Sequence, residues 1–278
     1  MRIWQVDFYR RPLRDVPGRV LWELLICDTT RHFTYEALCP QPEVNANWLV
    51  SQLRQAAGDN RPDVIQVFRP QSLSLIETAA QQLGMAVEAT RHTTALKQWL
   101  QERALQYAKQ EGYTGEAYHP IALDKPPPLP LPENLWGDRW RFASIPAGNI
   151  EEAFRDRPIP IVEMPESLLP LNLGLSSTVA VPGVIIDGGR KSMQLARWLQ
   201  DAQPVSLNYI PGAPDGLILE AGLVDRWVVA TFEDTEVATA ARMYEQRKLL
   251  SQRLHFLLVQ PDDSGMTYTG FWLLQTEN

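Results

Sequence analysis

The distribution of proline constrains this chain more than any other sequence feature. Twelve of its 22 prolines lie between residues 120 and 182, and they are dense in LDKPPPLPLPENLW, residues 123–136. Proline fixes φ and lacks a backbone N–H donor, so this stretch excludes a helix or a central strand and favours extended polyproline. The apolar residues between the prolines favour a surface strap over a ligand for a proline-binding module. We therefore expect a domain over residues 1–114, a proline-rich linker or strap over 115–169, and a second domain over 170–278.

Residues 1–114 predict a mixed α/β domain. Apolar side chains alternate in the first segment and run almost continuously in the second, which is typical of strands. The expected order is three antiparallel strands, followed by helix, strand, helix, strand and helix. These segments are residues 3–11, 19–27, 32–39, 45–58, 63–68, 72–84, 85–90 and 93–109.

Residues 170–278 predict a second α/β domain. Asp234 is the expected N-cap of its longest helix, because a side-chain oxygen before the first helical turn accepts free backbone N–H groups. The expected helices are residues 188–200 and 234–253. The expected strands are residues 178–187, 204–212, a pair within 216–232, 254–260 and 267–275.

Composition indicates a globular chain, with 45% apolar and 21% charged residues. No stretch approaches the roughly 18 consecutive apolar residues of a membrane helix, and MRIWQVDFYRR passes directly into a strand pattern without a leader. We therefore expect a cytoplasmic protein. The net charge of −7 argues against indiscriminate binding to nucleic acid. Residues 1–118 carry 13 basic and 13 acidic residues, whereas residues 119–278 carry 13 and 20, so the acidity belongs to the second part.

The two cysteines and four histidines predict neither a disulfide nor a metal site. In the expected hairpin Cys27 lies opposite Thr34, and Cys39 lies opposite Trp22, so the two thiols do not meet. The histidines are scattered and give no metal-ligand spacing. We expect no metal and no dinucleotide cofactor.

The order of elements in residues 1–114 is similar to the ribonuclease H-like fold. Nucleases of that fold need several carboxylates that converge on two metal ions. Asp7 occupies the first of these positions, but Glu43 lies before the first helix and Arg69 stands where the fourth strand should supply a carboxylate. The resemblance therefore implies a non-catalytic relative, with a residual metal-dependent nuclease that uses Asp7 as an alternative.

Alternating arginine and aromatic residues in DRWRF suggest a surface for single-stranded RNA. On one strand Arg139 and Arg141 share a face, while Trp140 and Phe142 share the other. Such residues bind phosphates and stack on bases. The alternative is that the aromatic side chains are core and that the arginines pair with nearby acids, Asp138 or Glu151.

Two further basic motifs are candidates for phosphate binding. IIDGGRKS places Arg190 and Lys191 at a glycine turn before a helix, where free N–H groups attract anions. The alternative is a tight turn that needs the positive φ of glycine. FYRRPLR places Arg10 and Arg11 at the end of the first strand. No nucleophile motif such as G-x-S-x-G is present, so the residues do not predict an enzyme.

An ordered set of motifs resembles the Tab/Atab family of cyanobacterial and plastid RNA-binding proteins. The set is WQVDFYRRP, RPIPIVEMPESLLP, PGVIIDGG, GLVDRWVVATF and the closing Trp272, Leu273 and Leu274. The resemblance covers nearly the whole chain. It implies a non-catalytic protein that binds the single-stranded leader of a photosystem mRNA, the photosystem I reaction-centre message, and promotes its translation in the cyanobacterial cytosol. The alternative is an assembly or scaffold protein for photosystem biogenesis that acts through protein partners.

The tryptophan–leucine–leucine motif itself admits two interpretations. It is either a foothold for a partner, which predicts an exposed Trp272, or a strand buried on both faces. In TYTGFWLLQ, Phe271 and Leu273 alternate with Trp272 and Leu274, and this pattern favours the strand.

Overall fold

The computed structural model describes residues 1–58 and 61–276. Contacts divide the chain into two compact units, residues 1–124 (unit 1) and residues 125–278 (unit 2). Of the segment expected to be a linker or strap, residues 115–124 thus belong to unit 1 and residues 125–169 to unit 2.

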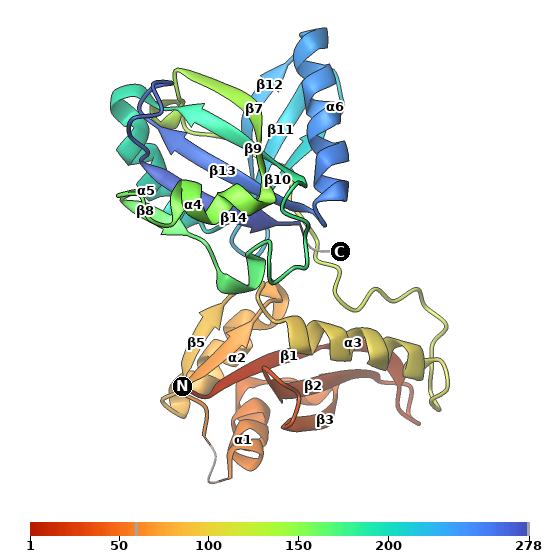
Figure 1. Ribbon diagram of the computed structural model, residues 1–278. Helices are drawn as coiled ribbons and strands as arrows, with labels where there is room; N and C mark the ends of the chain where they lie inside the picture. Colours follow the sequence, from red (N-terminus) through yellow and green to blue (C-terminus); the bar gives the residue numbers. More distant parts are fainter. Residues whose placement is uncertain (59–60, 277–278) are drawn as a thin grey trace. The chain divides into compact units, whose positions relative to one another are not determined.

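Unit 1 is a mixed sheet with helices on both faces (Figure 1). Its strands are β1 (Ile3–Arg14), β2 (Val20–Asp28), β3 (Thr34–Pro40), β4 (Val64–Val67) and β5 (Ala86–Ala89), and its helices are α1 (Ala46–Ala57), α2 (Pro70–Gln82) and α3 (Thr94–Tyr107). The strand order is β3-β2-β1-β4-β5. β1, β2 and β3 are antiparallel, while β4 and β5 run parallel to β1. The order of elements predicted from the sequence is confirmed.

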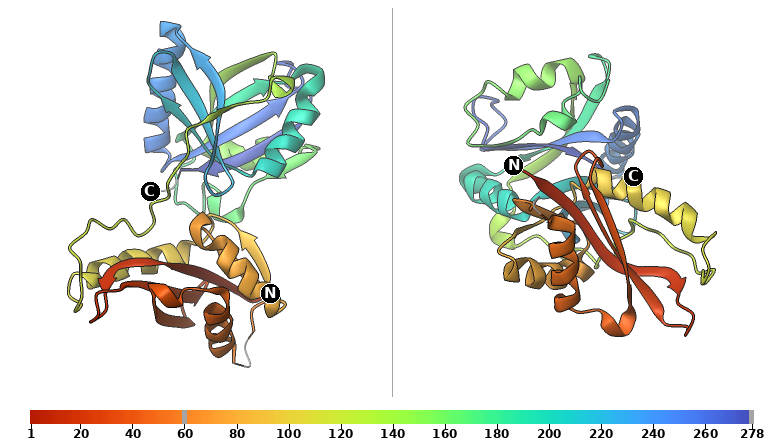
Figure 2. Two further views of the ribbon diagram at one scale, coloured as in Figure 1. Left: turned by 180° about the vertical axis from the view of Figure 1, so that it is seen from behind. Right: turned by 90° about the horizontal axis from the view of Figure 1, so that it is seen from below.

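The alternation of β1 divides the interior of unit 1 into two cores. Trp4 and Phe8 point toward α1 and α2, where Leu49 and Ile76 complete the packing. α3 covers the opposite face and buries Leu96 and Leu100 against residues of β2 and against Phe68, which follows β4 (Figure 2). Residues Gln5, Asp7 and Arg11 of β1 are polar, yet they are buried. Polar side chains are seldom buried, so these three residues distinguish this part of the sheet from an ordinary apolar core.

Unit 2 contains two sheets. One has the strand order β7-β9-β13-β14-β8 and the other β10-β11-β12-β6. The strands are β6 (Leu129–Pro130), β7 (Arg139–Pro146), β8 (Ile161–Glu163), β9 (Ala180–Asp187), β10 (Pro204–Ile210), β11 (Asp215–Ala221), β12 (Asp225–Phe232), β13 (Leu254–Gln260) and β14 (Gly270–Gln275). The helices are α4 (Ile150–Phe154), α5 (Ser192–Ala202) and α6 (Thr235–Leu250). Unit 2 is therefore also α/β, with mixed strand directions.

The tryptophan–leucine–leucine motif lies in β14, inside the larger sheet between β13 and β8. Trp272 and Leu274 pack into the core that the two sheets share. Phe271 and Leu273 pack into the core on the other face, against α4. All four side chains are less than 5% exposed. The predicted strand, buried on both faces, is confirmed, and the exposed Trp272 expected of a foothold is not observed.

The two cysteines lie as the predicted hairpin requires. Cys27 is opposite Thr34 and Cys39 is opposite Trp22, and both thiols are free and buried. Burial raises the pKa of Cys27 to about 12 and that of Cys39 to about 11. Both thiols therefore stay protonated at neutral pH.

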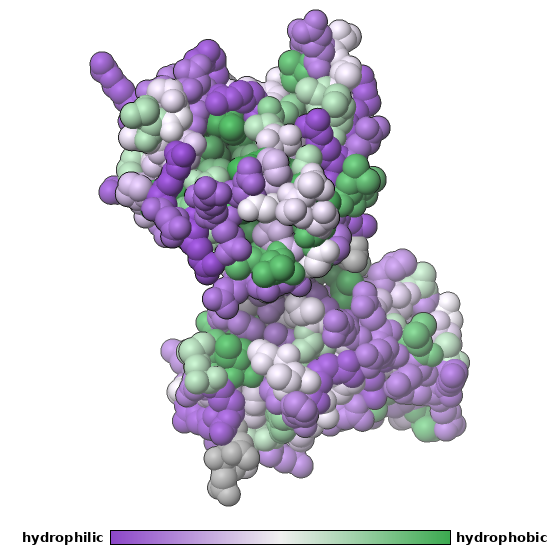
Figure 3. Space-filling model, in the orientation of Figure 1, coloured by the Kyte–Doolittle hydropathy of each residue, from purple (hydrophilic) through white to green (hydrophobic). Residues whose placement is uncertain are grey.

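The surface seen in Figure 3 is mainly hydrophilic, with small apolar patches. One patch lies over the C-terminal end of α6, where Leu249 and Leu250 are exposed. Every helix within the described residues is too short or too polar to cross a lipid bilayer.

Candidate functional site

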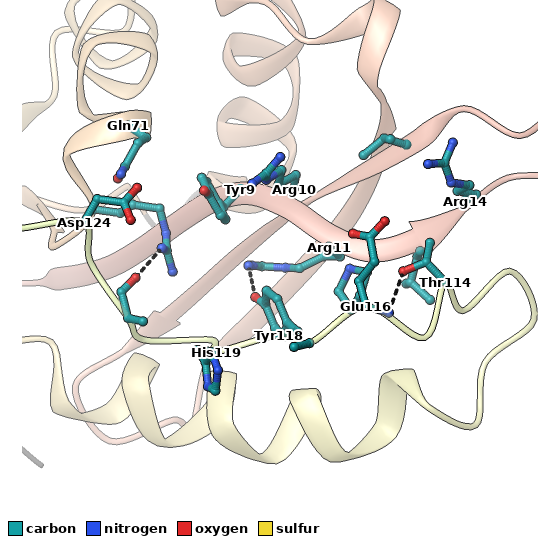
Figure 4. A pocket seen from close by; sticks show the side chains of 16 residues that line it. Tyr9, Arg10, Arg11, Arg14, Gln71, Thr114, Glu116, Tyr118, His119 and Asp124 are labelled. Carbon is teal, nitrogen blue, oxygen red and sulfur yellow. Dashed lines mark hydrogen bonds between the residues drawn. The ribbon is translucent and has the colours of Figure 1, made fainter.

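A polar cavity of unit 1 lies beside the second half of β1 (Figure 4). It has a volume of about 460 Å³ and is bounded by β1, the start of α2 and residues 114–124, which we call the covering segment. β1 supplies Tyr9, Arg10 and Arg14, and α2 supplies Gln71. Tyr118 and His119 of the covering segment close the opposite side.

Asp7 is fully buried beneath this cavity, and arginines hold both of its carboxylate oxygens. Arg69 Nε donates to Oδ1 at 2.7 Å, and Arg11 Nη2 donates to Oδ2 at 2.8 Å. Burial alone would raise the pKa of Asp7, but Arg69 and Arg11 outweigh that effect, and the pKa lies below its ordinary value. Asp7 is therefore a structural anion at neutral pH.

A second buried carboxylate, Glu23 of β2, joins the same network. Arg11 Nε donates to Glu23 at 3.0 Å, so one guanidinium bridges Asp7 and Glu23. Arg103 and the hydroxyl of Tyr107, both from α3, also donate to Glu23. We call Asp7, Glu23, Arg11, Arg69 and Arg103 the ion-pair cluster. Its two carboxylates are balanced by three guanidinium groups, as buried charges require.

The covering segment accepts further hydrogen bonds from two arginines of the cluster. Arg69 Nη2 donates to the carbonyl of Pro120 at 2.6 Å. Arg11 Nη1 donates to the Tyr118 hydroxyl at 2.7 Å (Figure 4). The Arg69 guanidinium also lies over the ring of Tyr9, 4.2 Å from its centroid. These contacts fix residues 118–120 against the sheet and seal Asp7 beneath the segment.

This arrangement does not resemble a divalent-metal site. A two-metal centre needs several carboxylates with free oxygens around the ions. Here the oxygens of Asp7 and Glu23 are occupied by cations, which would repel a metal ion. Over residues 1–58 and 61–276, no three His, Cys, Asp or Glu side chains gather as metal ligands would.

The cavity rim carries accessible charges of both signs. Arg10 and Arg14 are exposed, as are Glu116 and Asp124 of the covering segment. Arg14 donates one bond to the carbonyl of Gly18, whereas within the described residues Arg10 forms no ion pair. Arg11 belongs to the same FYRRPLR motif and also lines the cavity. It is buried, and its guanidinium donates to Asp7 and Glu23. Of the predicted Arg10 and Arg11, only Arg10 is thus free to meet a ligand.

The arginine–aromatic stretch forms β7 of unit 2. Trp140 and Phe142 pack against the core, and Arg139 and Arg141 lie on the opposite face. Arg141 Nη1 contacts Asp187 at 2.8 Å, and Arg139 Nη2 contacts Asp263 at 3.1 Å. The expected division of faces is observed. The partners of the arginines are Asp187 and Asp263 rather than Asp138 or Glu151.

Arg190 and Lys191 are exposed in the turn that precedes α5. Gly189 has a φ of +55°, and a Cβ at this position would lie 2.3 Å from Oδ2 of Asp138. The glycine is therefore required by the backbone turn itself, independently of any anion.

The predicted basic contacts do not all belong to one unit. Arg10 and Arg11 belong to unit 1, whereas those at 139, 141, 190 and 191 belong to unit 2.

Sequence reasoning identified Asp7 and Arg69 but missed Glu23, Tyr107 and Tyr118. Glu23 is the single charge inside the apolar run of β2, and such an isolated charge is a signal for a buried ion pair. Tyr107 occupies the apolar face predicted for its helix, with its hydroxyl directed to Glu23. Nothing local to Tyr118 distinguishes it from other residues of the extended covering segment.

Two family models match the chain in sequence. The model described as RNA-binding protein Tab2/Atab2 N terminal matches residues 3–103, and the model described as the C-terminal domain of RNA-binding protein Tab2/Atab2 matches residues 118–275.

Two plant proteins are similar over almost the whole chain, and both are named Protein TAB2 homolog, chloroplastic. The protein of Zea mays is 31% identical over 288 residues, which covers 99% of this chain and 71% of that protein. The protein of Arabidopsis thaliana is 30% identical over 277 residues, which covers 98% and 74%.

Among solved structures, the integrase catalytic core domain of HTLV-2 in complex with magnesium aligns with 37% of this chain and 70% of that chain. Its sequence identity is 15% and its TM-score is 0.26.

Proposed function

Because the chain belongs to the Tab2/Atab2 family of RNA-binding proteins, we propose that it binds a single-stranded mRNA leader without cleaving it. The target we propose is a photosystem message, that of the photosystem I reaction centre, whose translation the bound protein promotes. Since the relatives are named chloroplastic, the corresponding place of action is the cytosol of a cyanobacterium. The closed ion-pair cluster around Asp7 is the structural observation that supports binding without cleavage.

We infer that unit 1 is a ribonuclease H-like domain without its metal centre. The strand order β3-β2-β1-β4-β5 supports this inference, and Asp7 lies in the first strand, where that fold places a catalytic carboxylate. Arg69 follows directly after the fourth strand and binds Asp7. A cation thus replaces the metal as the partner of the carboxylate, and a nucleic-acid-binding scaffold remains.

The exposed rim of the cavity supplies the phosphate contacts in this proposal. Arg10 and Arg14 both lie at the rim beside β1 and are exposed, so each guanidinium can meet a phosphate from solvent. Each phosphate contact with a single strand changes the slope of log K against log salt by roughly −0.7. Two contacts therefore contribute about −1.4 to that slope. Because the protein has a net charge of −7, nonspecific electrostatic attraction should add little to its affinity for RNA.

The test is RNA binding measured across a salt series. The probes are the leader of the photosystem I reaction-centre message and a scrambled RNA of the same composition. We expect tighter binding of the leader, and a slope that becomes shallower by about 1.4 in the double variant Arg10→Ala/Arg14→Ala. Arg54→Ala, which removes an exposed arginine from α1, is the matched control. Equal affinity for leader and scrambled RNA would refute sequence-specific binding.

Catalysis is tested separately with magnesium or manganese present. We expect neither the wild-type protein nor Asp7→Asn to cleave the leader, because the cluster leaves Asp7 no free oxygen. Cleavage by the wild type that disappears in Asp7→Asn would show a residual nuclease. RNA that crosslinks only when a co-purifying protein is present would instead support the scaffold role.

A further inference from the structure

Unit 2 contains an apolar cleft that the proposed phosphate contacts of unit 1 do not use. Its volume is about 530 Å³, within the range of about 300–1,000 Å³ typical of small-ligand sites. Residues 130–137, β7 and β12 form its walls. Leu131, Leu135 and Leu195 line it as buried members of the core. The cleft is thus an opening in the unit 2 core rather than a groove between surface loops.

Two tryptophans give the cleft flat walls. Trp136 is 54% exposed, although its Nε1 donates to the carbonyl of Leu131 at 2.8 Å. That bond holds the indole edge, so the ring keeps one orientation while much of its surface stays in contact with solvent. Trp140 of β7 contributes a second, half-buried ring. An exposed indole that is fixed in place is suited to stacking, because little conformational entropy is lost when a ring packs on it.

Polar groups stand at the edge of the cleft. β6 pairs with β12 only at Trp227 and Val228, so among the described residues the outer edge of residues 229–231 has no strand partner. Backbone N–H and C=O groups at such an edge are available to a ligand. Arg139, the first residue of β7, is among the residues that line the same cleft, and its side chain is 68% exposed. Its ion pair with the exposed Asp263 is solvated and therefore costs little to exchange for a phosphate.

These features match the chemistry of one nucleotide. The base of a nucleotide offers a flat face for Trp136 and hydrogen-bonding edges for the free side of β12, and its phosphate offers an anion for Arg139. A peptide strand fits less well, because only residues 229–231 of the β12 edge are free and β-strand addition depends on a longer row of main-chain bonds. We propose that this cleft takes a single unstacked base of the bound RNA, an inference that rests on the proposed RNA-binding function.

Trp136→Leu tests the inference, because it removes the stacking surface and keeps the site apolar. With the leader RNA as probe, we expect affinity to fall by about 5- to 150-fold, the effect of losing one stacked base. The salt slope should stay unchanged, since no phosphate contact is lost. Leu171→Ala, which truncates an 81% exposed apolar side chain of unit 2 outside the cleft, is the control and should leave affinity unchanged.

Two further measurements separate this inference from the proposed function. Leader RNA that contains 4-thiouridine should crosslink to the peptide that carries residues 129–140 in the wild type. AMP and UMP should quench tryptophan fluorescence in the wild type more than in Trp136→Leu, even if the leader shows no preference over scrambled RNA. Unchanged leader affinity in Trp136→Leu, with no crosslink in this peptide, overturns the base site while the salt-series result stands. A peptide as the true occupant would give the same overturning result.

Discussion

Replacing Arg69 by methionine removes one of the two cations that hold the buried Asp7 carboxylate. Methionine keeps an apolar stem of similar length against Tyr9 and Phe68, so the change is mainly one of charge. Oδ1 of Asp7 loses its partner, while Oδ2 keeps Arg11. The covering segment also loses the donor that binds the Pro120 carbonyl. The variant therefore leaves a buried anion half compensated.

Breaking a buried ion pair from one side costs roughly 3–5 kcal/mol. Because Arg11 remains, we expect the lower end, about 3 kcal/mol, which lowers the ratio of folded to unfolded unit 1 roughly 150-fold. The cost depends on pH. In the wild type the pKa of Asp7 is below its ordinary value, so its contribution is present above about pH 4 and is lost as pH falls further. In the variant the pKa rises, Asp7 takes up a proton more readily, and the difference from wild type shrinks between pH 7 and pH 4.

Hydrogen exchange followed peptide by peptide separates the two units. We expect amides of β1 and β4 to exchange faster in Arg69→Met, and amides of β13 to be unaffected. Asp7→Asn/Arg69→Met should regain at least half of the lost stability, since no unpaired anion remains. Arg54→Met on the exposed face of α1 is the control. The reasoning would be refuted if Arg69→Met lowered the free energy of unfolding by less than about 1 kcal/mol and if the effects of Arg69→Met and Asp7→Asn simply added in the double variant.

Three further changes address unit 2. Trp272→Ala should cost about 3–5 kcal/mol of unfolding free energy in urea, because the indole is buried, and RNA affinity per folded molecule should not change. A selective loss of affinity would make the motif a binding site after all. Asp234→Ala should cost about 1 kcal/mol, since its side chain caps two N–H groups of α6, whereas Glu233→Ala should cost almost nothing. Burial lowers the pKa of His255 to about 3, so the unfolded chain binds the proton first and stability falls as pH drops below about 6.5. Between pH 6.5 and pH 5 the wild type should lose about 2 kcal/mol more than His255→Gln, and equal losses would contradict the assignment of a neutral His255.

Local signals in the sequence sufficed for most elements of the fold. Asp234 is the helix cap that the sequence predicts, and its side chain accepts two free N–H groups of α6. The alternation around Trp272 predicted a strand buried on both faces, and the structure confirms it. Each of these signals depends on residues close together in the chain, where physical rules are strongest.

The candidate site was only partly predictable, because its bonds join distant parts of the chain. Arg69 was recognised as a substitution for a carboxylate, but its bond to Asp7 spans 62 positions. The bond from Tyr107 to Glu23 spans 84 positions. Such pairs follow from how α3 and the covering segment pack on the sheet, which local patterns do not specify. The unit 2 cleft likewise depends on the path of the proline-rich residues 130–137.

The pairing of β8 with β14 has a consequence for the order in which the molecule can be made. Ile161 pairs with Gly270, so β8 leaves the ribosome 109 residues before its partner. Chain synthesis proceeds at roughly 5–20 residues per second, so the edge of β8 that pairs with β14 stays unpaired for about 5–20 s. All strands of unit 1, in contrast, pair within the first 89 residues. Unit 1 can therefore be folded while unit 2 is still incomplete, and unit 2 is the part of the nascent chain that most needs protection from aggregation.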